Sequence, residues 1–407
     1  MTRKRKKVVV IAPGCDGTDV GEAWSSFQWV RQLSKLYDIT VLTYRKRNRS
    51  SLVGQLPDIE VIEWKDLPLV HRWERFNSGF KPGILTFNWK ALRWLRKEIV
   101  QGRQIDLIHQ ITPIALRYPS VGYRLGLPYI IGPLAGSLST PAKFEEEMSG
   151  ETWYLRLRQS DAFRIKFDPF LRRTFERADV VIGVAPYVRD ILGPLELKRF
   201  EVLCETAVTE LPKLNATREN PDICRLLYVG RITRMKGVRD AIRALAQLTR
   251  SEQVTLDIVG DGDDRGPCER EAHKLGVDHK VVFHGKVPRA DVDDFYRNAD
   301  VFLFPSMREP SGNVVLEAMS FGLPLIVADR GGPGFVVDNS FGIRVPVTSP
   351  NEFAKRLGTA IITLVSDPAL RKKMGDMARE RVATEHVWGE KSKVMSRIYE
   401  DAIGDYE

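Results

Sequence analysis

The stretch "DVFLFPSMREPSGNVVLEAMSFGLPLIVAD", residues 300–329, contains two short apolar runs separated by a loop and a helix-forming segment. The runs at 300–306 and 323–329 predict buried strands, and the segment 312–322 predicts the helix between them. Apolar strands joined through a helix are typical of a parallel sheet that is covered on both faces. The stretch therefore predicts an α/β fold.

The same alternation of strand and helix patterns runs through the rest of the chain. In the first half, strands are predicted at 6–13, 38–44, 59–64, 105–111, 128–134 and 178–185, and helices at 21–36 and 83–99. In the second half, further strands are predicted at 224–230, 254–262 and 280–287, and helices at 236–248, 264–276 and 290–299. Two such series predict two doubly wound, Rossmann-like parallel-sheet domains. A polar, turn-rich stretch at 211–222 lies in the predicted junction, which spans 193–222.

The composition suits a globular protein with two domains. The chain has 407 residues, of which 43% are hydrophobic and 28% are charged, and a domain holds about 100–200 residues. No apolar run approaches the roughly 18 residues that a membrane-spanning helix needs. The charged N-terminus leads into a short apolar run and lacks the apolar core of a signal peptide. Scattered cysteines, at 15, 204, 224 and 268, predict reduced thiols in a cytoplasm rather than a metal or redox site.

The positive charge is concentrated in the first half of the chain. Residues 1–200 carry 33 Lys/Arg and 21 Asp/Glu, a net charge of +12, and the remaining residues carry −3. Such an asymmetry indicates that the first half meets something anionic. Nucleic acid, an anionic membrane surface and a phosphorylated acceptor all qualify, and solubility alone is the simpler interpretation.

Ligands of doubly wound sheets bind beyond the carboxyl ends of the strands, so the loops there are the candidate site. Glu309 falls in the loop after the strand at 300–306, and Glu317 falls inside the helix that begins near Gly312 or Asn313. The free N–H groups of a helix start suit a phosphate, and carboxylates suit sugar and ribose hydroxyls. The pattern fits a nucleotide-sugar, although a helix with an acidic first turn would look the same.

Three further loops are expected on the same edge. The first, after the strand at 224–230, carries two cations, Arg231 and Lys236, which could neutralise a diphosphate. The second is the turn from Gly260 to Gly262, where the backbone could approach a ligand closely. The third is "FHGKVP", which overlaps the end of the strand at 280–287 and includes Val287. A solvated basic turn is the alternative for the cations.

These motifs, in this order and spacing, resemble the retaining glycosyltransferases of family 4. The resemblance rests on "GRITRMKG", "IVGDGDD", "FHGKVP", the opening stretch and the "GG" at 331–332, and it is strongest over residues 224–350. "IHQITPI" and "YIIGPLAGS" are similar to segments of bacterial surface-polysaccharide members. The resemblance implies the GT-B fold, in which two Rossmann-like domains face each other across a cleft. It implies an acceptor-binding domain at 1–200, a donor-binding domain at 201–385 and a last helix at 386–407 that crosses back to the first domain.

The resemblance also implies roles for particular residues. Glu309 would engage the donor sugar, Glu317 the ribose, and Arg231 and Lys236 the donor phosphates. The remaining donor-binding residues would be the backbone of Gly312, Asn313 and Val314, with Gly260, Gly262 and Val287 in the neighbouring loops. Catalysis would fall to Glu309, Arg231 and Lys236, together with His109 on the acceptor side. The family needs no metal, so "DGD" at 261–263 is expected to be a nucleotide loop rather than a metal site.

This chain departs from the family's pattern at three positions. Ser311 stands where many members have Phe, and no Glu follows the double glycine. Many members have a second histidine two positions after the first, where this chain has Ile111. His109 is therefore either an acceptor-side residue or an ordinary histidine at the end of a strand.

The first half supplies a second candidate loop, "PGCDGTDVGEAW". Gly17 and Gly21 give this loop backbone freedom, and the helix start after it could hold an acceptor phosphate. The loop is not a G-x-G-x-x-G fingerprint, and no acidic residue ends the second strand, which argues against nicotinamide binding. Tryptophans mixed with Lys and Arg, in 88–99 and 153–175, could lie on an anionic bilayer or form core stripes with basic edges.

The expected function is retaining transfer of a sugar from a UDP- or GDP-sugar to a glycan or lipid-linked acceptor. No cofactor, no obligatory metal and no nucleic acid are expected, and the expected location is the cytoplasm, peripheral on the inner face of its membrane. The alternatives are another GT-B chemistry, such as a nucleotide-sugar epimerase, and a non-catalytic partner that binds nucleotide-sugar or membrane.

Overall fold

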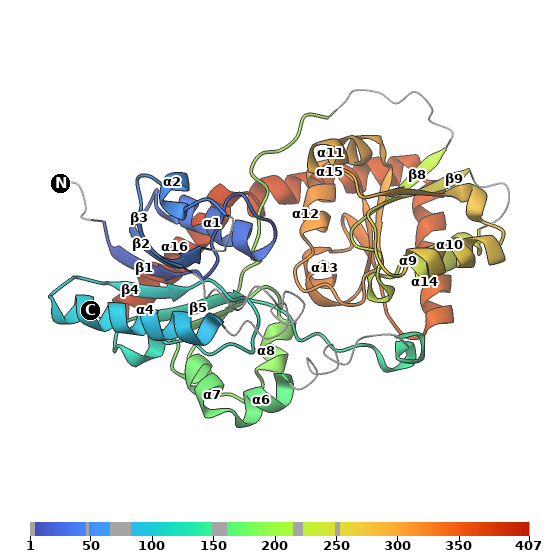
Figure 1. Ribbon diagram of the computed structural model, residues 1–407. Helices are drawn as coiled ribbons and strands as arrows, with labels where there is room; N and C mark the ends of the chain where they lie inside the picture. Colours follow the sequence, from blue (N-terminus) through green and yellow to red (C-terminus); the bar gives the residue numbers. More distant parts are fainter. Residues whose placement is uncertain are drawn as a thin grey trace. The chain divides into compact units, whose positions relative to one another are not determined.

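A computed structural model shows two compact α/β units (Figure 1). The structure describes residues 5–45, 49–65, 83–148, 161–214, 223–248 and 253–406. The first unit comprises Met1–Ser137, Thr152–Glu205 and Trp388–Glu407, and the second comprises Leu138–Glu151 and Thr206–Val387. The predicted α/β class with two doubly wound sheets is confirmed.

The first unit is built on a seven-stranded parallel sheet of order β3-β2-β1-β4-β5-β6-β7. The strands are β1 Lys7–Ile11, β2 Asp38–Arg45, β3 Glu60–Lys65, β4 Leu107–Gln110, β5 Tyr129–Leu134, β6 Val180–Gly183 and β7 Phe200–Val202. Every residue of β4, β5 and β6 is buried. Strands buried on both faces explain why the sequence shows continuous apolar runs rather than alternation.

The second unit is built on a six-stranded parallel sheet of order β10-β9-β8-β11-β12-β13. The strands are β8 Cys224–Val229, β9 Val254–Val259, β10 Val281–Gly285, β11 Val301–Phe304, β12 Leu325–Ala328 and β13 Gly342–Val345. The central strands β11 and β12 are buried throughout. The two strands that the sequence did not predict, β7 and β13, are each the last strand of their sheet, where one side has no partner strand and the apolar signal is weakest.

Helices cover these sheets. In the first unit they are α1 Glu22–Leu33, α2 Leu52–Gln55, α4 Gly83–Val100, α6 Asp161–Phe167, α7 Pro169–Glu176, α8 Tyr187–Ile191 and α16 Trp388–Gly404. In the second unit they are α9 Val238–Leu245, α10 Arg265–Lys274, α11 Arg289–Asn298, α12 Asn313–Ser320, α13 Gly331–Val336, α14 Pro350–Ser366 and α15 Pro368–Glu385. None of the helices in the described ranges is long and apolar enough to cross a bilayer.

The last helix, α16, belongs to the first unit, where it packs against α1. The ring of Trp388 lies edge-on to the ring of Trp29, with 5.2 Å between their centroids. Farther along the helix, the Tyr37 and Tyr399 rings approach to 5.1 Å, and the hydroxyl of Tyr37 bonds to Ser396. Buried aromatic pairs of this kind contribute roughly 0.5–1.5 kcal/mol beyond their burial, so α16 is an integral part of this core.

Two sequence-based interpretations lie partly outside the described residues. The predicted junction includes 215–222, and the basic-aromatic segment 153–175 includes 153–160. The described part of that segment forms α6 and α7, which expose Phe163, Phe167 and Phe170 beside basic residues.

Candidate functional site

The predicted donor-side residues come together at the carboxyl edge of the second sheet. Strands β9, β8, β11 and β12 are neighbours and run parallel, so the loops that follow them meet at one edge. The loops after β8 and β11 are joined directly, because Met307 N–H donates to the Met235 carbonyl over 2.9 Å.

Glu309 lies between the predicted phosphate-binding lysine and the start of α12. One carboxylate oxygen, Oε2, forms an ion pair with Nζ of Lys236. The other oxygen, Oε1, accepts a hydrogen bond from Gly312 N–H at 3.2 Å. Only 19% of the Glu309 side chain and 15% of the Lys236 side chain are exposed, so little water screens their attraction. Three residues predicted separately from the sequence thus form one contact set.

Lys236 is held by a tight turn. It ends the 3₁₀ helix Arg234–Lys236, and Gly237 follows with φ +76°. A Cβ atom on Gly237 would lie 2.2 Å from the Pro305 carbonyl oxygen, so only glycine fits there. The turn directs Lys236 toward the loop after β11, where its ammonium group also lies over the Phe304 ring at 5.8 Å.

Arg231 begins the same loop and is exposed. Its carbonyl oxygen accepts a hydrogen bond of 2.9 Å from the buried Tyr228 hydroxyl, which fixes the backbone. The loop therefore presents one solvated cation, Arg231, and one half-buried, paired cation, Lys236.

The glycines at 260 and 262 pack closely against the chain's own backbone, and their approach to a ligand stays a prediction. A Cβ atom on Gly260 would lie 1.9 Å from the Gly230 carbonyl oxygen, and one on Gly262 would lie 2.1 Å from the Ile232 carbonyl oxygen. The backbone that packs closely against these two glycines is therefore the chain's own loop after β8. Their fit brings that loop against the loop after β9, which sets where Arg231 lies.

Two polar groups at the start of α12 already have partners within the protein. Gly312 has φ +81° and its N–H group is bonded to Glu309, while the amide oxygen of Asn313 accepts from the Thr206 hydroxyl at 2.7 Å. Val314 is half-buried in the first turn. Glycine is needed at 312 because its left-handed backbone turns the chain from the loop into the helix.

Glu317 lies on α12 with partners from the preceding helix. The Tyr296 hydroxyl donates to its carboxylate over 3.1 Å, and Arg289 approaches the other oxygen at 3.3 Å. Burial raises the pKa of Glu317, and the charge of Arg289 and the hydrogen bond from Tyr296 oppose that rise. Val287, two positions after β10, is half-buried.

His109 is fully buried in β4 of the first unit. Its Nε2 lies 2.7 Å from the Gly132 carbonyl oxygen, and its Nδ1 lies 2.5 Å from the Tyr399 hydroxyl. Because a carbonyl only accepts, Nε2 carries the proton and Nδ1 accepts from Tyr399. Burial lowers the pKa of His109 to about 4. Both ring nitrogens thus bind the protein itself, and the geometry favours the structural interpretation over contact with an acceptor.

The loop of the first unit that was predicted to face the acceptor is also held by hydrogen bonds within the protein. Gly17 N–H donates to the Gln55 side chain over 2.8 Å, and Gly21, with φ +62°, begins α1. The carboxylate of Glu22 accepts from Ile114 N–H over 3.0 Å, which joins this loop to the segment after β4. Gln55 and Glu22 were missed from the sequence. Gln55 lies outside any recognisable motif, and Glu22, although it lies in the quoted loop, gives no sequence signal of its contact with the segment after β4.

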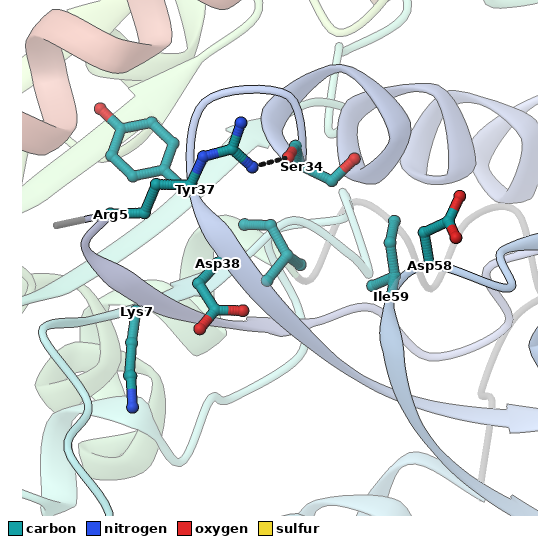
Figure 2. A pocket seen from close by; sticks show the side chains of 8 residues that line it. Arg5, Lys7, Ser34, Tyr37, Asp38, Asp58 and Ile59 are labelled. Atoms are coloured by element: carbon teal, nitrogen blue, oxygen red, sulfur yellow. Dashed lines mark hydrogen bonds between the residues drawn. The ribbon is translucent and has the colours of Figure 1, made fainter. Parts of the chain in front are cut away.

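A pocket of about 240 Å³ lies elsewhere in the first unit (Figure 2). It is lined by Arg5, Lys7, Ser34, Tyr37, Asp38, Ile39, Asp58 and Ile59. These residues lie at the amino ends of β1, β2 and β3, the edge opposite to the one where doubly wound sheets bind their ligands. The pocket therefore is not part of the candidate site.

Among the described residues, no group of three or more His, Cys, Asp or Glu side chains is arranged to hold a metal ion. Within "DGD", the Asp261 carboxylate accepts from Gly262 N–H at 2.8 Å and so stabilises the turn.

Two family models match this chain, one in each half. The family model "Glycosyltransferase Family 4" matches residues 21–203, and the model "Glycosyl transferases group 1" matches residues 213–381. An uncharacterized glycosyltransferase of Methanocaldococcus jannaschii is 34% identical over 179 residues, which cover 44% of this chain and 45% of that protein. The chain thus spans about half the length of the curated relatives that it matches.

Solved structures share the fold over nearly the whole chain. A sucrose-phosphate synthase from Thermosynechococcus elongatus has a TM-score of 0.66 at 20% identity, covering 98% of this chain and 100% of its own. The Anabaena protein HepE, solved in complex with UDP, has a TM-score of 0.62 at 19% identity, covering 97% of this chain and 100% of its own. At these identities the likeness concerns the fold, and it confirms the GT-B class of two Rossmann-like domains.

Proposed function

Because each half of this family-4-like chain matches a glycosyltransferase family model, we propose that the protein transfers a sugar from a nucleoside diphosphate sugar to an acceptor hydroxyl. The observation that carries the proposal is the contact of Lys236, Glu309 and Gly312 at the carboxyl edge of the second sheet. These residues lie inside the matched range 213–381 and unite a cation for phosphate with a carboxylate for sugar hydroxyls.

The diphosphate would be bound by Arg231 and Lys236. Without donor, Lys236 is neutralised by Glu309. An incoming diphosphate offers Lys236 a second anion and leaves Glu309 free to accept hydrogen bonds from sugar hydroxyls. Donor binding would therefore rearrange one ion pair, and the half-buried location makes each new interaction stronger than it would be in water.

The chemistry that we propose proceeds with retention of configuration. The bond between the anomeric carbon and the diphosphate oxygen breaks, and the acceptor oxygen bonds to that carbon on the same face. The acceptor proton passes to the departing diphosphate oxygen, and Arg231 and Lys236 stabilise the negative charge that grows there. These two cations supply the neutralisation for which a metal ion would otherwise serve, so we expect no metal requirement.

Glu317 would bind the ribose hydroxyls of the donor. Its carboxylate is fixed by Tyr296 and Arg289, which orients it before any ligand arrives. A pre-oriented acceptor of hydrogen bonds loses little conformational entropy on binding, which suits a residue that contributes affinity.

The acceptor would be a glycan or a lipid-linked sugar of surface polysaccharide synthesis, met at the inner face of a membrane. The support is the net charge of +12 on residues 1–200 together with exposed rings on α6 and α7, where Phe163, Phe167 and Phe170 are 65%, 57% and 51% exposed. Basic residues attract anionic lipid, and aromatic rings enter the headgroup region.

The test is a panel of UDP- and GDP-sugars, with release of UDP or GDP as the readout and Lys236→Ala beside the unchanged protein. We expect one donor to be turned over, and we expect Lys236→Ala to lower kcat by about 100-fold or more, as lost charge-stabilising groups do. Arg356→Gln, on the exposed face of α14, is the control for loss of a cation. Binding of a donor without turnover under any acceptor would identify a non-catalytic nucleotide-sugar binder instead.

Turnover in excess EDTA tests the metal-free mechanism directly. Loss of activity that Mg²⁺ or Mn²⁺ restores would show that Arg231 and Lys236 are not sufficient.

A further inference from the structure

The motif "GRITRMKG" carries three cations, and the structure gives each of them different surroundings. Arg231 is exposed, and Lys236 is paired with Glu309. Arg234 lies between them in the sequence and is buried, with only 5% of its side chain exposed. A cation held away from water needs partners of opposite charge, and the positions of those partners indicate what Arg234 does.

Two carboxylates from different segments hold the Arg234 guanidinium group. Asp240, in the first turn of α9, accepts from Nη1 over 2.6 Å and from Nη2 over 3.1 Å. Glu147 accepts from Nε over 2.8 Å. Burial raises the pKa of Glu147, but the charges of Arg234 and Arg243 outweigh it and hold that pKa below its ordinary value. Because both partners of Arg234 are anions, its charge is compensated within the protein, and Arg234 is not a third cation for the donor diphosphate.

Glu147 lies on a segment that comes from the first half of the chain. Residues 138–148, which we call the strap, follow β5 in the sequence but belong to the second unit. Phe144 is fully buried there beside Phe353, with 6.2 Å between the ring centroids. Arg243 of α9 bonds to Glu147 over 3.0 Å, and the Arg234 guanidinium group lies over the Phe144 ring at 5.4 Å. The strap is therefore built into the second unit.

The turn that carries Lys236 is short and depends on its anchors. Residues Arg234–Lys236 form a single turn of 3₁₀ helix, whose hydrogen-bond geometry is poorer than that of an α-helix. The side chain of Arg234 ties this turn by charge to both α9 and the strap. Lys236 lies only two positions later, so a shift of Arg234 would move its ammonium group. A misplacement of about 1 Å is enough to weaken catalysis strongly.

A buried charge network of this kind contributes more to fixed geometry than to stability. The cost of removing charges from water offsets most of their attraction, so apolar residues of similar volume would stabilise the fold as well or better. Paired hydrogen bonds from a planar guanidinium group, in contrast, fix the orientation of both partners. The network thus suits a place where the position of a neighbouring group matters.

We propose that Arg234, held by Asp240 and Glu147, positions Lys236 for the donor diphosphate. The strap lies within residues 21–203, the range of the other family model, and thereby completes the phosphate site of the second half. This inference rests on the proposed function and adds positioning residues to its site. All three residues act through Lys236 rather than by touching the donor.

Isothermal titration of UDP and of GDP tests this role, since both carry the diphosphate without a sugar. The proteins are the unchanged chain, Glu147→Gln, Lys236→Ala and the double variant. We expect each single variant to bind the nucleotide about tenfold more weakly than the unchanged protein. The double variant should bind no more weakly than Lys236→Ala alone, because Glu147 acts only through Lys236.

Glu146→Gln is the matched control. It removes the same charge from an exposed neighbour in the strap and should bind the nucleotide as the unchanged protein does. Melting curves show whether each variant is folded. If Glu147→Gln does not fold, Glu147→Asp, which keeps the charge on a shorter side chain, takes its place in the same comparison and should weaken binding less.

Two results would overturn the positioning role. One is a lower melting temperature of the Glu147 variant with unchanged nucleotide affinity, and the other is an additive loss in the double variant. Either would show that the network only stabilises the fold, while the proposed function stands on the weaker binding of Lys236→Ala. If neither nucleotide binds the unchanged protein, the proposed function fails and the positioning role fails with it.

Discussion

Glu309 and Lys236 illustrate how one ion pair can connect sugar recognition with charge stabilisation. Each occupies a loop after a different strand, and each was predicted from a different motif. Sequence spacing could indicate both residues, but it could not show that they contact each other, because that contact depends on the order of strands β8 and β11. The pair makes the two residues energetically dependent, so their substitutions should not be additive.

Replacing Glu309 with Gln should lower kcat by roughly 10²–10³-fold, because the amide cannot hold the charge that positions Lys236 and accepts fewer hydrogen bonds from the sugar. Steady-state kinetics of Glu309→Gln, Lys236→Ala and the double variant measure the effect. We expect the activation barrier of the double variant to rise by less than the sum of the increases in the two single variants. Strict additivity, or turnover of Glu309→Gln near the unchanged rate, would remove the pair from the mechanism.

His109 should govern acid stability rather than catalysis. Its pKa in the folded protein, about 4, lies below the ordinary value of 6.5, so the unfolded chain binds a proton that the folded protein excludes. Stability should therefore be fully present above pH 6.5 and should fall as the pH decreases toward 4, by at most about 3 kcal/mol from this residue.

Urea denaturation at pH 7 and pH 4.5 measures this loss, with His109→Gln as the variant. The variant should be less stable at neutral pH and should lose less on acidification. Tyr399→Phe, which removes one partner of the ring and keeps the histidine, is the control that retains the acid response. An identical pH response in His109→Gln would show that other groups cause it.

At the scale of elements, glycines explain how the loops of the site fit together. The close approach of Gly260 and Gly262 to a ligand stays a prediction, and the structure adds that both pack against the backbone of the loop after β8. The residue type was informative, but a glycine that faces a ligand and one that faces another loop have the same sequence signature. The central strands and the helices α1, α4, α9, α10, α11 and α12 were predicted because burial on a fixed period leaves a pattern. The edge strands β7 and β13 and the long helices α14 and α15 were not predicted.

Gly260→Ala should destabilise the second unit by several kcal/mol, because its φ of +138° disfavours a side chain and the new Cβ would overlap the Gly230 carbonyl. Thermal melting measures the loss. Gly389→Ala is the matched control: it lies in α16 with nothing within 4 Å of the added Cβ, so it should be neutral or stabilising by up to about 1 kcal/mol. Equal melting temperatures for the two variants would contradict the packing role of Gly260.

At the scale of the whole molecule, the sequence shows that positive charge is concentrated in the first half. It does not show which aromatic residues of that half are buried and which are exposed. On α4, Phe87 is buried and Trp89 is 60% exposed, although the two are only two positions apart. Only the direction of each helical face decides this, and that direction depends on how the helix packs.

Sedimentation with liposomes tests the proposed membrane surface. Binding should require anionic lipid, and it should fall at high salt because each basic residue contributes about 1 kcal/mol that ions screen. Phe163→Ser with Phe167→Ser should weaken binding further, while Leu275→Ser, an exposed apolar residue of the second unit, should not. Equal binding to neutral vesicles, or none to either kind, would remove the membrane from the proposal.

The chain passes between the two units four times, and the last passage returns it to the first unit. Residues 388–407 therefore join the first unit only after the whole of the second unit in the sequence. During synthesis on the ribosome, the first sheet can pair all its strands once residue 202 has emerged, but the face that receives α16 stays uncovered. Trp29 and Tyr37 would then be exposed to water until the second unit has been translated. Folding of the first unit should therefore finish last, although its sequence is synthesised first, and the nascent chain should depend on chaperones over that interval.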